Sequence, residues 1–153
     1  MAVKPIPDGY HTLTPYLIVR GAAAAIDFYK QAFGATELMR LPGPDGKVGH
    51  AEIRIGDSII MLADECPEGK SPDTLGGSPV TLMLYVEDCD AMFHKAIAAG
   101  GTVARPLADQ FYGDRFGGVK DPFGHVWHVA THKEDVTPEE VARRMEKLMS
   151  QGK

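Results

Sequence analysis

Hydrophobic and polar residues follow the same order of periodicities twice along the chain. In the first half, alternation over 12–19 predicts a strand, and apolar residues at helical spacing over 21–33 predict a helix that ends at Gly34. Three strand-like runs follow, over 36–41, 47–55 and 58–63. The dipeptide Gly56-Asp57 separates the last two runs and predicts a two-residue hairpin loop. This half therefore predicts the order strand–helix–strand–strand–strand.

The second half repeats this order after a connector over 64–79 that has no periodicity. A strand is predicted over 80–86, and Asp88 can cap a helix that ends at Gly100-Gly101. Three more strands are predicted over 102–109, 115–120 and 125–132. Two such βαβββ modules, about 11–64 and 80–132, predict an α+β fold. In this fold, eight mainly antiparallel strands form a curved sheet around a cavity, and the helices cover the other face.

The C-terminal segment predicts a separate helix. Thr137-Pro138-Glu139-Glu140 is a capping box with proline at the first helical position, so a helix is expected over about 138–149. Its apolar stripe is predicted to lie against the outside of the sheet or against a partner subunit, and consists of Val141, Met145 and Leu148.

Composition and charge indicate a folded protein and disfavour nucleic acid and membranes as partners. The 153 residues are predicted to form a single domain, and 44% hydrophobic with 24% charged residues is typical of a folded protein. A net charge of −5 disfavours nucleic acid as a partner. The N-terminus lacks the apolar stretch of a signal peptide, and no apolar run approaches the ~20 residues of a membrane span. Cys66 and Cys89 lack metal-site spacing. We expect a soluble, cytoplasmic protein with no membrane partner.

Two motifs resemble a known superfamily. Ile26-Asp27-Phe28-Tyr29 and Asp121-Pro122-Phe123-Gly124 resemble the first helix and the last hairpin of the vicinal oxygen chelate superfamily of glyoxalases, bleomycin-resistance proteins and extradiol dioxygenases. Residues 49–57 and 124–136 resemble its PhnB-like subgroup, and the resemblance covers about 11–136. It implies a small-molecule ligand and a homodimer, but says almost nothing of the substrate.

Metal-dependent members of this superfamily place four ligands, usually His, Gln or Glu, on the first and last strands of each module. The resemblance puts these positions at Thr14, Met61, Thr81 and His128. Two hydroxyls and a thioether cannot replace carboxylates and imidazoles around a divalent metal. We therefore predict that the usual metal site is absent and that no cofactor is bound. A non-standard divalent metal on His50, Glu52 and His128 is the alternative.

The hairpin registers predict which side chains line the cavity. With Gly56-Asp57 as the turn, Glu52 pairs with Met61, so Glu52 and His50 share the cavity face of Met61. On the last hairpin, the same argument pairs Lys120 with His125, Gly117 with His128 and Arg115 with Ala130, which predicts Arg115 and His128 in the cavity. The further predicted ligand-binding residues are Thr14, Tyr16, Met61, Thr81, Met83, Tyr85 and Tyr112. Trp127 is predicted in the core beneath a helix.

These residues support several kinds of function. The first is a metal-independent protein that binds a small molecule in the cavity. The second is an isomerase or lyase in which Glu52 or His50 acts as base, a histidine such as His128 shuttles a proton, and Arg115 holds an anionic oxygen. The third is stoichiometric drug sequestration, as in bleomycin-resistance relatives. A hydrogen-bonded polar network without a ligand is the structural alternative.

Overall fold

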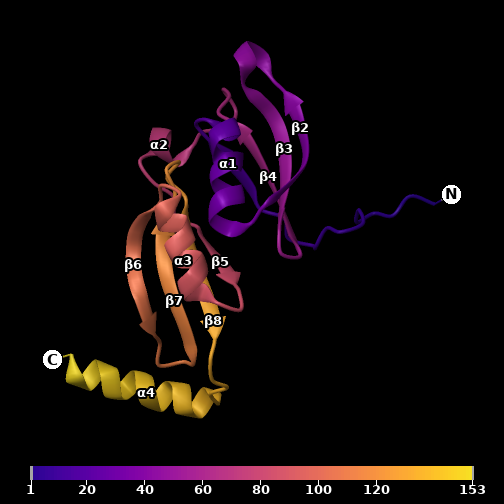
Figure 1. Ribbon diagram of the computed structural model, residues 1–153. Helices are drawn as coiled ribbons and strands as arrows, with labels where there is room; N and C mark the ends of the chain where they lie inside the picture. Colours follow the sequence, from indigo (N-terminus) through magenta and orange to yellow (C-terminus); the bar gives the residue numbers. More distant parts are fainter. Residues whose placement is uncertain (1, 153) are drawn as a thin grey trace.

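The computed structural model describes residues 2–152 and contains eight strands in two four-stranded sheets (Figure 1). The first module consists of β1 (Tyr16–Val19), α1 (Ala22–Phe33), β2 (Thr36–Pro42), β3 (Val48–Ile55) and β4 (Ser58–Asp64). A connector with the short helix α2 (Pro72–Leu75) leads to the second module. That module consists of β5 (Thr81–Tyr85), α3 (Cys89–Ala98), β6 (Thr102–Asp109), β7 (Asp114–Lys120) and β8 (Val126–His132), and α4 (Pro138–Gln151) follows. The predicted α+β fold is confirmed.

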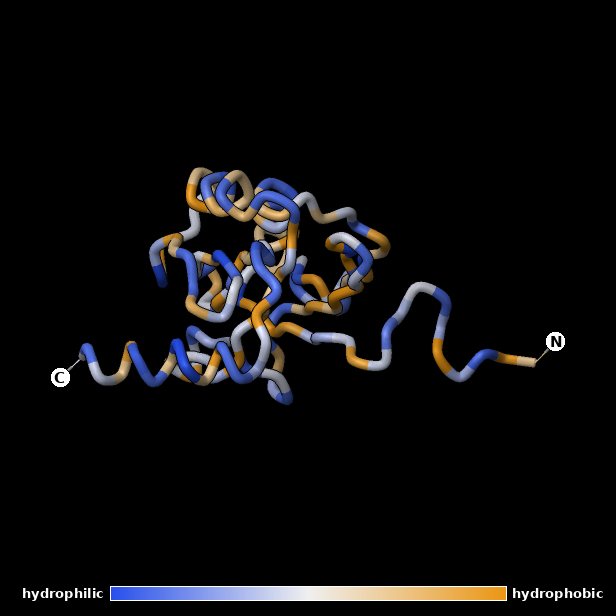
Figure 2. Tube along the Cα trace, turned by 90° about the horizontal axis from the view of Figure 1, so that it is seen from below, coloured by the Kyte–Doolittle hydropathy of each residue, from blue (hydrophilic) through white to orange (hydrophobic). Residues whose placement is uncertain are grey.

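The two sheets have the same topology. The first has the order β1-β4-β3-β2 and the second the order β5-β8-β7-β6. In each sheet the first strand runs parallel to the last strand of its module, and the other pairs are antiparallel. Helices α1 and α3 lie side by side in one layer over the strands (Figure 2). Neither α1 nor α3 covers the opposite face of the two sheets.

The helices begin and end where local chemistry satisfies their free backbone groups. The carboxylate of Asp64 accepts hydrogen bonds from the N–H groups of Gly21 and Ala22, at 2.8 Å each, and so closes the first turn of α1. Three such backbone hydrogen bonds, the third from Val48, outweigh burial and lower the pKa of Asp64. Helix α1 ends at Gly34, which adopts φ +70°. The sequence predicted the C-terminal ends of α1 and α3 to within one residue.

An aromatic cluster joins the two modules. Trp127 of β8 is fully buried, as predicted, and its ring lies 5.2 Å from Tyr29 and 4.8 Å from Phe33 of α1. Buried Asp121 accepts hydrogen bonds from the Tyr29 hydroxyl at 2.7 Å and from the Trp127 indole N–H at 2.9 Å. Burial, with Asp121 next to it, raises the pKa of Tyr29, so the phenol remains protonated and donates. A single carboxylate therefore links helix α1 to the second sheet.

The N-terminal strand is shorter than the alternation predicted. The pattern indicated a strand over 12–19, but β1 begins at Tyr16, and Leu13 is 84% exposed. Pro15 has no N–H for the ladder, so the pairing with β4 starts after it. The preceding residues form an arm that extends away from the sheet (Figure 1).

Helix α4 extends along the second module at its far end (Figure 1). It begins at Pro138, as predicted, with the Thr137 hydroxyl accepting from the N–H of Glu140. Arg144 holds it to the body through the Glu134 carboxylate at 2.7 Å and the Phe111 carbonyl at 3.0 Å. None of its described side chains is buried. Over residues 2–152, no helix combines the length and hydrophobicity that a membrane crossing requires.

Candidate functional site

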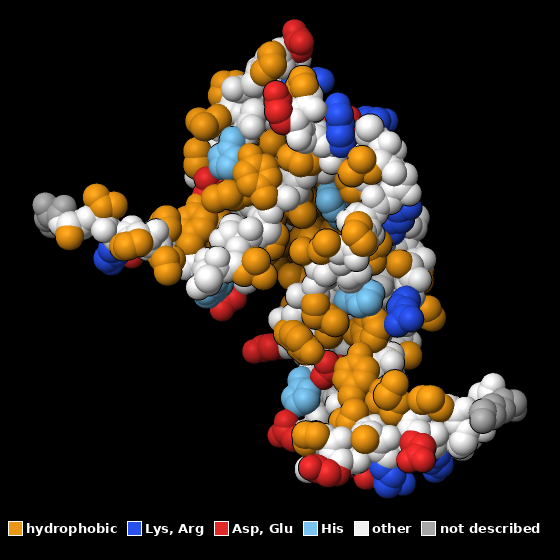
Figure 3. Space-filling model, turned by 180° about the vertical axis from the view of Figure 1, so that it is seen from behind, with side chains coloured by type: hydrophobic (Ala, Val, Ile, Leu, Met, Phe, Trp, Pro, Cys, Tyr) orange, Lys and Arg blue, Asp and Glu red, His pale blue; other side chains and the backbone are white. Residues whose placement is uncertain are grey.

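The candidate site lies on the sheet face opposite helices α1 and α3. Figure 3 shows this face from behind, with hydrophobic and histidine side chains over a surface that is hollowed near its middle. In the first sheet, Glu52 pairs with Met61 and Ile55 with Ser58, so the predicted register of this hairpin is confirmed. Strand alternation then places Glu52 and His50 on the same side of β3. The two-residue loop at Gly56-Asp57 sets this arrangement.

Three polar side chains on this face form a hydrogen-bonded chain. The Tyr16 hydroxyl lies 2.8 Å from Nδ1 of His50, and Nε2 of His50 lies 2.8 Å from Oε2 of Glu52. Glu52 is buried, His50 is intermediate in exposure, and Tyr16 is exposed. Because imidazole can accept a proton at one nitrogen and release one from the other, this order connects an interior carboxylate to a surface phenol.

Two hollows flank the chain. One, of about 610 Å³, lies between the N-terminal arm and the sheet and includes Thr14, Glu52 and Met61 in its lining. The other, of about 550 Å³, lies toward the connector and includes Tyr16, Lys47 and Cys66. Since Glu52 reaches the first and Tyr16 the second, His50 links groups in both. Each hollow is within the size range of small-molecule sites.

The predicted register of the last hairpin was wrong by one residue. His128 pairs with Gly118 instead of Gly117, and Lys120 pairs with Val126 instead of His125. The Asp121 carboxylate accepts from the N–H groups of Phe123 and His125, at 2.9 Å each, and the backbone bond from Asp121 to His125 makes the loop three residues long. A shift of one residue moves each side chain to the other face.

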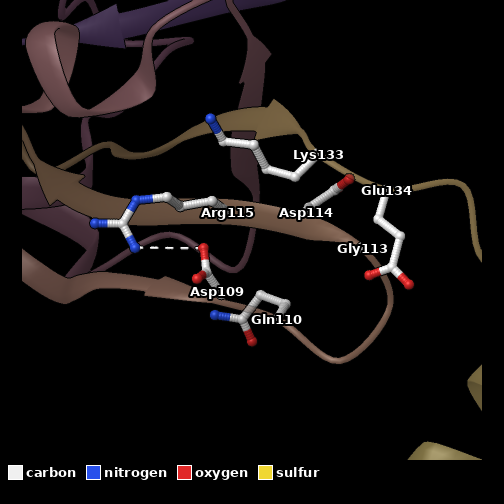
Figure 4. Close-up of a pocket in the computed structure, with 7 residues that line it drawn as sticks. All are labelled: Asp109, Gln110, Gly113, Asp114, Arg115, Lys133 and Glu134. Atoms are coloured by element: carbon white, nitrogen blue, oxygen red, sulfur yellow. Dashed lines mark hydrogen bonds and ion pairs between the residues drawn. The ribbon is translucent and has the colours of Figure 1, made fainter.

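Arg115 is the residue most affected by this correction. It pairs with Thr131 and therefore faces the helices, where its guanidinium holds both carboxylate oxygens of Asp90 on α3, at 2.8 and 3.0 Å. A further contact at 3.4 Å joins it to Asp109 (Figure 4). The hydrogen bond with Asp90 raises the pKa of Arg115 and lowers that of Asp90. Arg115 is thus an ion-pair residue beside α3, and its predicted cavity position was wrong.

His128 lies on the open face of the second sheet, where Met83 is its strand partner and where Phe116 and Arg105, not the predicted Arg115, are its neighbours. Its ring stacks on that of Phe116, with centroids 4.6 Å apart. Burial first, and then the positive charge of Arg105, lower the pKa of His128. The sequence did not predict Phe116 here, because the wrong register assigned it to the other face. It did not predict Arg105 either, because the bulges of β6 that turn Arg105 to this face have no local sequence signal.

A second polar cluster lies near the end of the second sheet that carries α4. The Tyr85 hydroxyl donates to Asp114 at 2.6 Å, and His132 lies 2.7 Å from Asp114 and 2.8 Å from Asp135. These hydrogen bonds outweigh burial and lower the pKa of Asp114, while the two carboxylates raise the pKa of His132. The Asp114 hydrogen bond first, with burial, raises the pKa of Tyr85. Predicted ligand residue Tyr85 is therefore held by a structural carboxylate.

The other predicted residues are divided between the two sheets. Thr81 and Met83 are on the His128 face of β5, since Met83 pairs with His128 and Thr81 with Val126. Tyr112 lies in the β6–β7 turn, and burial, together with Asp114, raises its pKa. His50 and Glu52 belong to the first sheet and His128 to the second, and no three His, Cys, Asp or Glu side chains among residues 2–152 lie close enough to hold a metal ion.

The sequence resemblance assigns the family's four metal positions to Thr14, Met61, Thr81 and His128. Thr14 and Met61 line the hollow beside Glu52, while Thr81 and His128 face the open side of the second sheet. One imidazole, two hydroxyls and a thioether do not fit a divalent metal.

Comparison with known proteins gives a family match over most of the chain. The model of the Glyoxalase/Bleomycin resistance protein/Dioxygenase superfamily matches residues 10–129. Protein Rv0887c of Mycobacterium tuberculosis H37Rv is 50% identical over 138 residues, which cover 87% of this chain and 81% of that protein.

Solved structures have the same fold. Protein PA1353 from Pseudomonas aeruginosa is 28% identical, with a TM-score of 0.66, over 81% of this chain and 99% of that one. The PhnB protein from Bacillus cereus is 21% identical, with a TM-score of 0.61, over 79% of this chain and 99% of that one. The predicted resemblance to the superfamily is confirmed, and the PhnB protein shares its fold.

Proposed function

The chain belongs to the glyoxalase/bleomycin resistance protein/dioxygenase superfamily, and on that premise we propose that it binds a small organic molecule on the open sheet face without a divalent metal. The observation that carries this proposal is the hydrogen-bonded chain of Tyr16, His50 and Glu52 between two hollows. A buried carboxylate beside an apolar wall favours a ligand that has both an apolar body and a hydrogen-bond donor.

The wall of the larger hollow supports this choice. Met39 and Met61 provide thioether side chains, which adapt to ligands of different shape, and Pro5, Ile6 and Pro7 of the arm form the opposite side. Glu52 is the acidic side chain in this lining. A ligand hydroxyl or amine placed here would donate to Glu52, while its carbon skeleton contacts the methionines.

The same polar chain favours a second function, proton transfer at carbon. A base at Glu52 would remove a proton from the carbon next to a carbonyl, and the electron pair would move onto the carbonyl oxygen. His50 would then give a proton to the far carbon of a conjugated enolate and take the Glu52 proton across their hydrogen bond. Both side chains are thereby restored, and the double bond moves without a net change in atoms. Binding without turnover would instead describe a sequestering protein.

We expect Glu52→Gln to weaken, by about tenfold or more, the binding of each hydrogen-bond donor ligand that stabilises the wild-type protein in a thermal-shift screen of metabolites and drugs, because an amide replaces the carboxylate acceptor. Glu37→Gln is the matched control, since Glu37 lies in the same sheet and bonds to Lys30 and Arg40 on the helix side. For each ligand, exchange of its α-proton in D₂O, followed by NMR, reports turnover. Catalysis by Glu52 predicts exchange slowed by about 10²–10⁴ in Glu52→Gln.

Two results would contradict the proposal. One is a wild-type protein that no member of the screen stabilises. The other is equal affinity in Glu52→Gln and Glu37→Gln, which would place the ligand away from the polar chain. The proposal also states that no divalent metal is needed. A large rise in the melting temperature of the wild-type protein on addition of manganese, iron, nickel or zinc would contradict this part.

We also propose that two copies assemble through the open faces. Large apolar side chains stand exposed there, namely Tyr16, Met39, Leu41, Met83 and Tyr85. Patches of this kind on a helix-free sheet face are typical of protein interfaces. Light scattering on a sizing column is expected to give twice the 16.6 kDa chain mass, and Leu41→Asp is expected to reduce it to one chain. Leu75→Asp, on the exposed helix α2, should leave the dimer intact. A wild-type monomer would contradict this assembly.

A further inference from the structure

One row of residues crosses all four strands of the second sheet on its open face. Arg105 of β6, Gly118 of β7, His128 of β8 and Met83 of β5 are successive Cα partners. Gly118 contributes no side chain to this row. A Cβ atom there would lie 3.2 Å from Cβ of Arg105 and 3.2 Å from Cδ2 of His128. Gly118 therefore allows the guanidinium stem and the imidazole to approach one another across β7.

Arg105 has a free positive charge on this face. Five other arginines bond to carboxylates, namely Arg20, Arg40, Arg115, Arg143 and Arg144. Within residues 2–152, Arg105 has neither an ion pair nor a side-chain hydrogen bond, and its guanidinium carbon lies 5.9 Å from the ring centroid of Phe116. In a chain of net charge −5, an arginine left without a carboxylate and supported by an aromatic ring retains its full capacity for an anion.

The backbone of β6 directs Arg105 onto this face. Register shifts occur on both sides of it, between Val103 and Arg105 and between Arg105 and Ala108. β-Bulges redirect a side chain where regular pairing would not, and they are frequent beside binding sites. Pro106 follows directly and has no N–H for the ladder. Arg105 thus pairs with Gly118 between two register shifts, with regular pairing of β6 and β7 on either side.

We infer that this row binds the carboxylate of an aromatic or similarly apolar acid. Arg105 would hold the two oxygens with two parallel N–H bonds, and a neutral His128 would donate one N–H from the other side of Gly118. The apolar body of the acid would lie on the His128 ring and the Met83 thioether, which is 44% exposed. This inference rests on the proposed small-molecule function and goes beyond it, because it assigns an acid to the second sheet, apart from the donor-bearing ligand proposed beside Glu52 on the first sheet.

The test compares 1-naphthoate with its neutral isostere 1-naphthamide, each titrated into ¹⁵N-labelled full-length protein and followed by NMR. The wild-type protein is expected to bind naphthoate at least about tenfold more tightly, with shifts at residues 105, 118 and 128. Arg105→Gln should remove this preference while naphthamide binding persists, and Arg105→Lys should restore part of it. Arg54→Gln is the matched control, because Arg54 is also exposed and free of ion pairs among the described residues but belongs to the first sheet.

The outcomes separate this inference from the function on which it rests. Equal affinities for the acid and the amide, or a preference that survives in Arg105→Gln, would overturn the carboxylate row and leave the small-molecule proposal standing. A preference lost in Arg54→Gln instead would move the anion to the first sheet and also overturn it. If neither probe nor any screened molecule shifted a resonance on either sheet face, both proposals would fail.

Discussion

Replacing Asp121 with alanine is expected to destabilise the fold by about 3–5 kcal/mol, because one buried carboxylate accepts four hydrogen bonds. Two come from the backbone N–H groups of Phe123 and His125, and two from the side chains of Tyr29 and Trp127. Alanine would leave these buried donors without an acceptor, and each unpaired buried group costs about 1–3 kcal/mol before relaxation. The loss affects the hairpin turn and the junction of the modules together.

Urea denaturation of the wild-type protein and four variants measures this effect. Asp121→Asn retains one amide oxygen as acceptor and should lose less stability than Asp121→Ala. Tyr29→Phe removes only the phenol donor and should cost about 1.5–3 kcal/mol. Asp8→Ala is the surface control, since its partner Lys4 and its own side chain are mostly exposed. If Asp121→Ala unfolded at the same urea concentration as Asp8→Ala, the account of the module junction would be wrong.

Replacing Gly113 with alanine is expected to release the segment that leads to helix α4. Gly113 adopts φ +103°, and its carbonyl accepts the N–H groups of Lys133 at 2.8 Å and Glu134 at 3.0 Å. The Cβ of an alanine at position 113 would overlap the carbonyl oxygen of Glu134. The alanine backbone would also have to keep a positive φ, which L-residues with a side chain rarely adopt. Strain and overlap together are expected to cost about 2–5 kcal/mol. Since no described α4 residue is buried, local opening relieves the overlap most easily.

Hydrogen exchange detects this opening. The amides of Lys133 and Glu134 should exchange about thirtyfold faster, or more, in Gly113→Ala. Gly34→Ala is the control, because Gly34 has φ +70° but no atom within 4 Å of a built Cβ. It should lose only about 1 kcal/mol, without faster exchange at 133 and 134. Unchanged exchange in Gly113→Ala would show that the segment is held by other contacts.

The elements and the first hairpin could be predicted because their determinants are local. Apolar spacing and the glycine at Gly34 define α1 within one residue, and the capping box at Thr137 defines the start of α4. The two-residue loop Gly56-Asp57 determines the partner of Glu52, because loop length sets register in a hairpin. The shared face of His50 and Glu52 follows from the alternation of side chains along β3.

The last hairpin could not be predicted in the same way. Its loop length depends on the Asp121 carboxylate, which accepts backbone N–H groups of the turn and is held by Tyr29 and Trp127. One of these donors is 92 residues away in sequence. A local pattern contains no such contact. The predicted register was therefore wrong by one residue, and Arg115 was predicted on the wrong face of the sheet.

The sequence by itself therefore determined the repeated modules, the family and the pairing of Glu52 with Met61. These features depend on periodicity and turn chemistry within short segments. Only the tertiary structure decided that His50 bonds to both Tyr16 and Glu52, and that Arg105 rather than Arg115 accompanies His128. Both depend on which strands lie side by side and where a bulge or a buried carboxylate changes their register, and these are contacts between residues far apart along the chain.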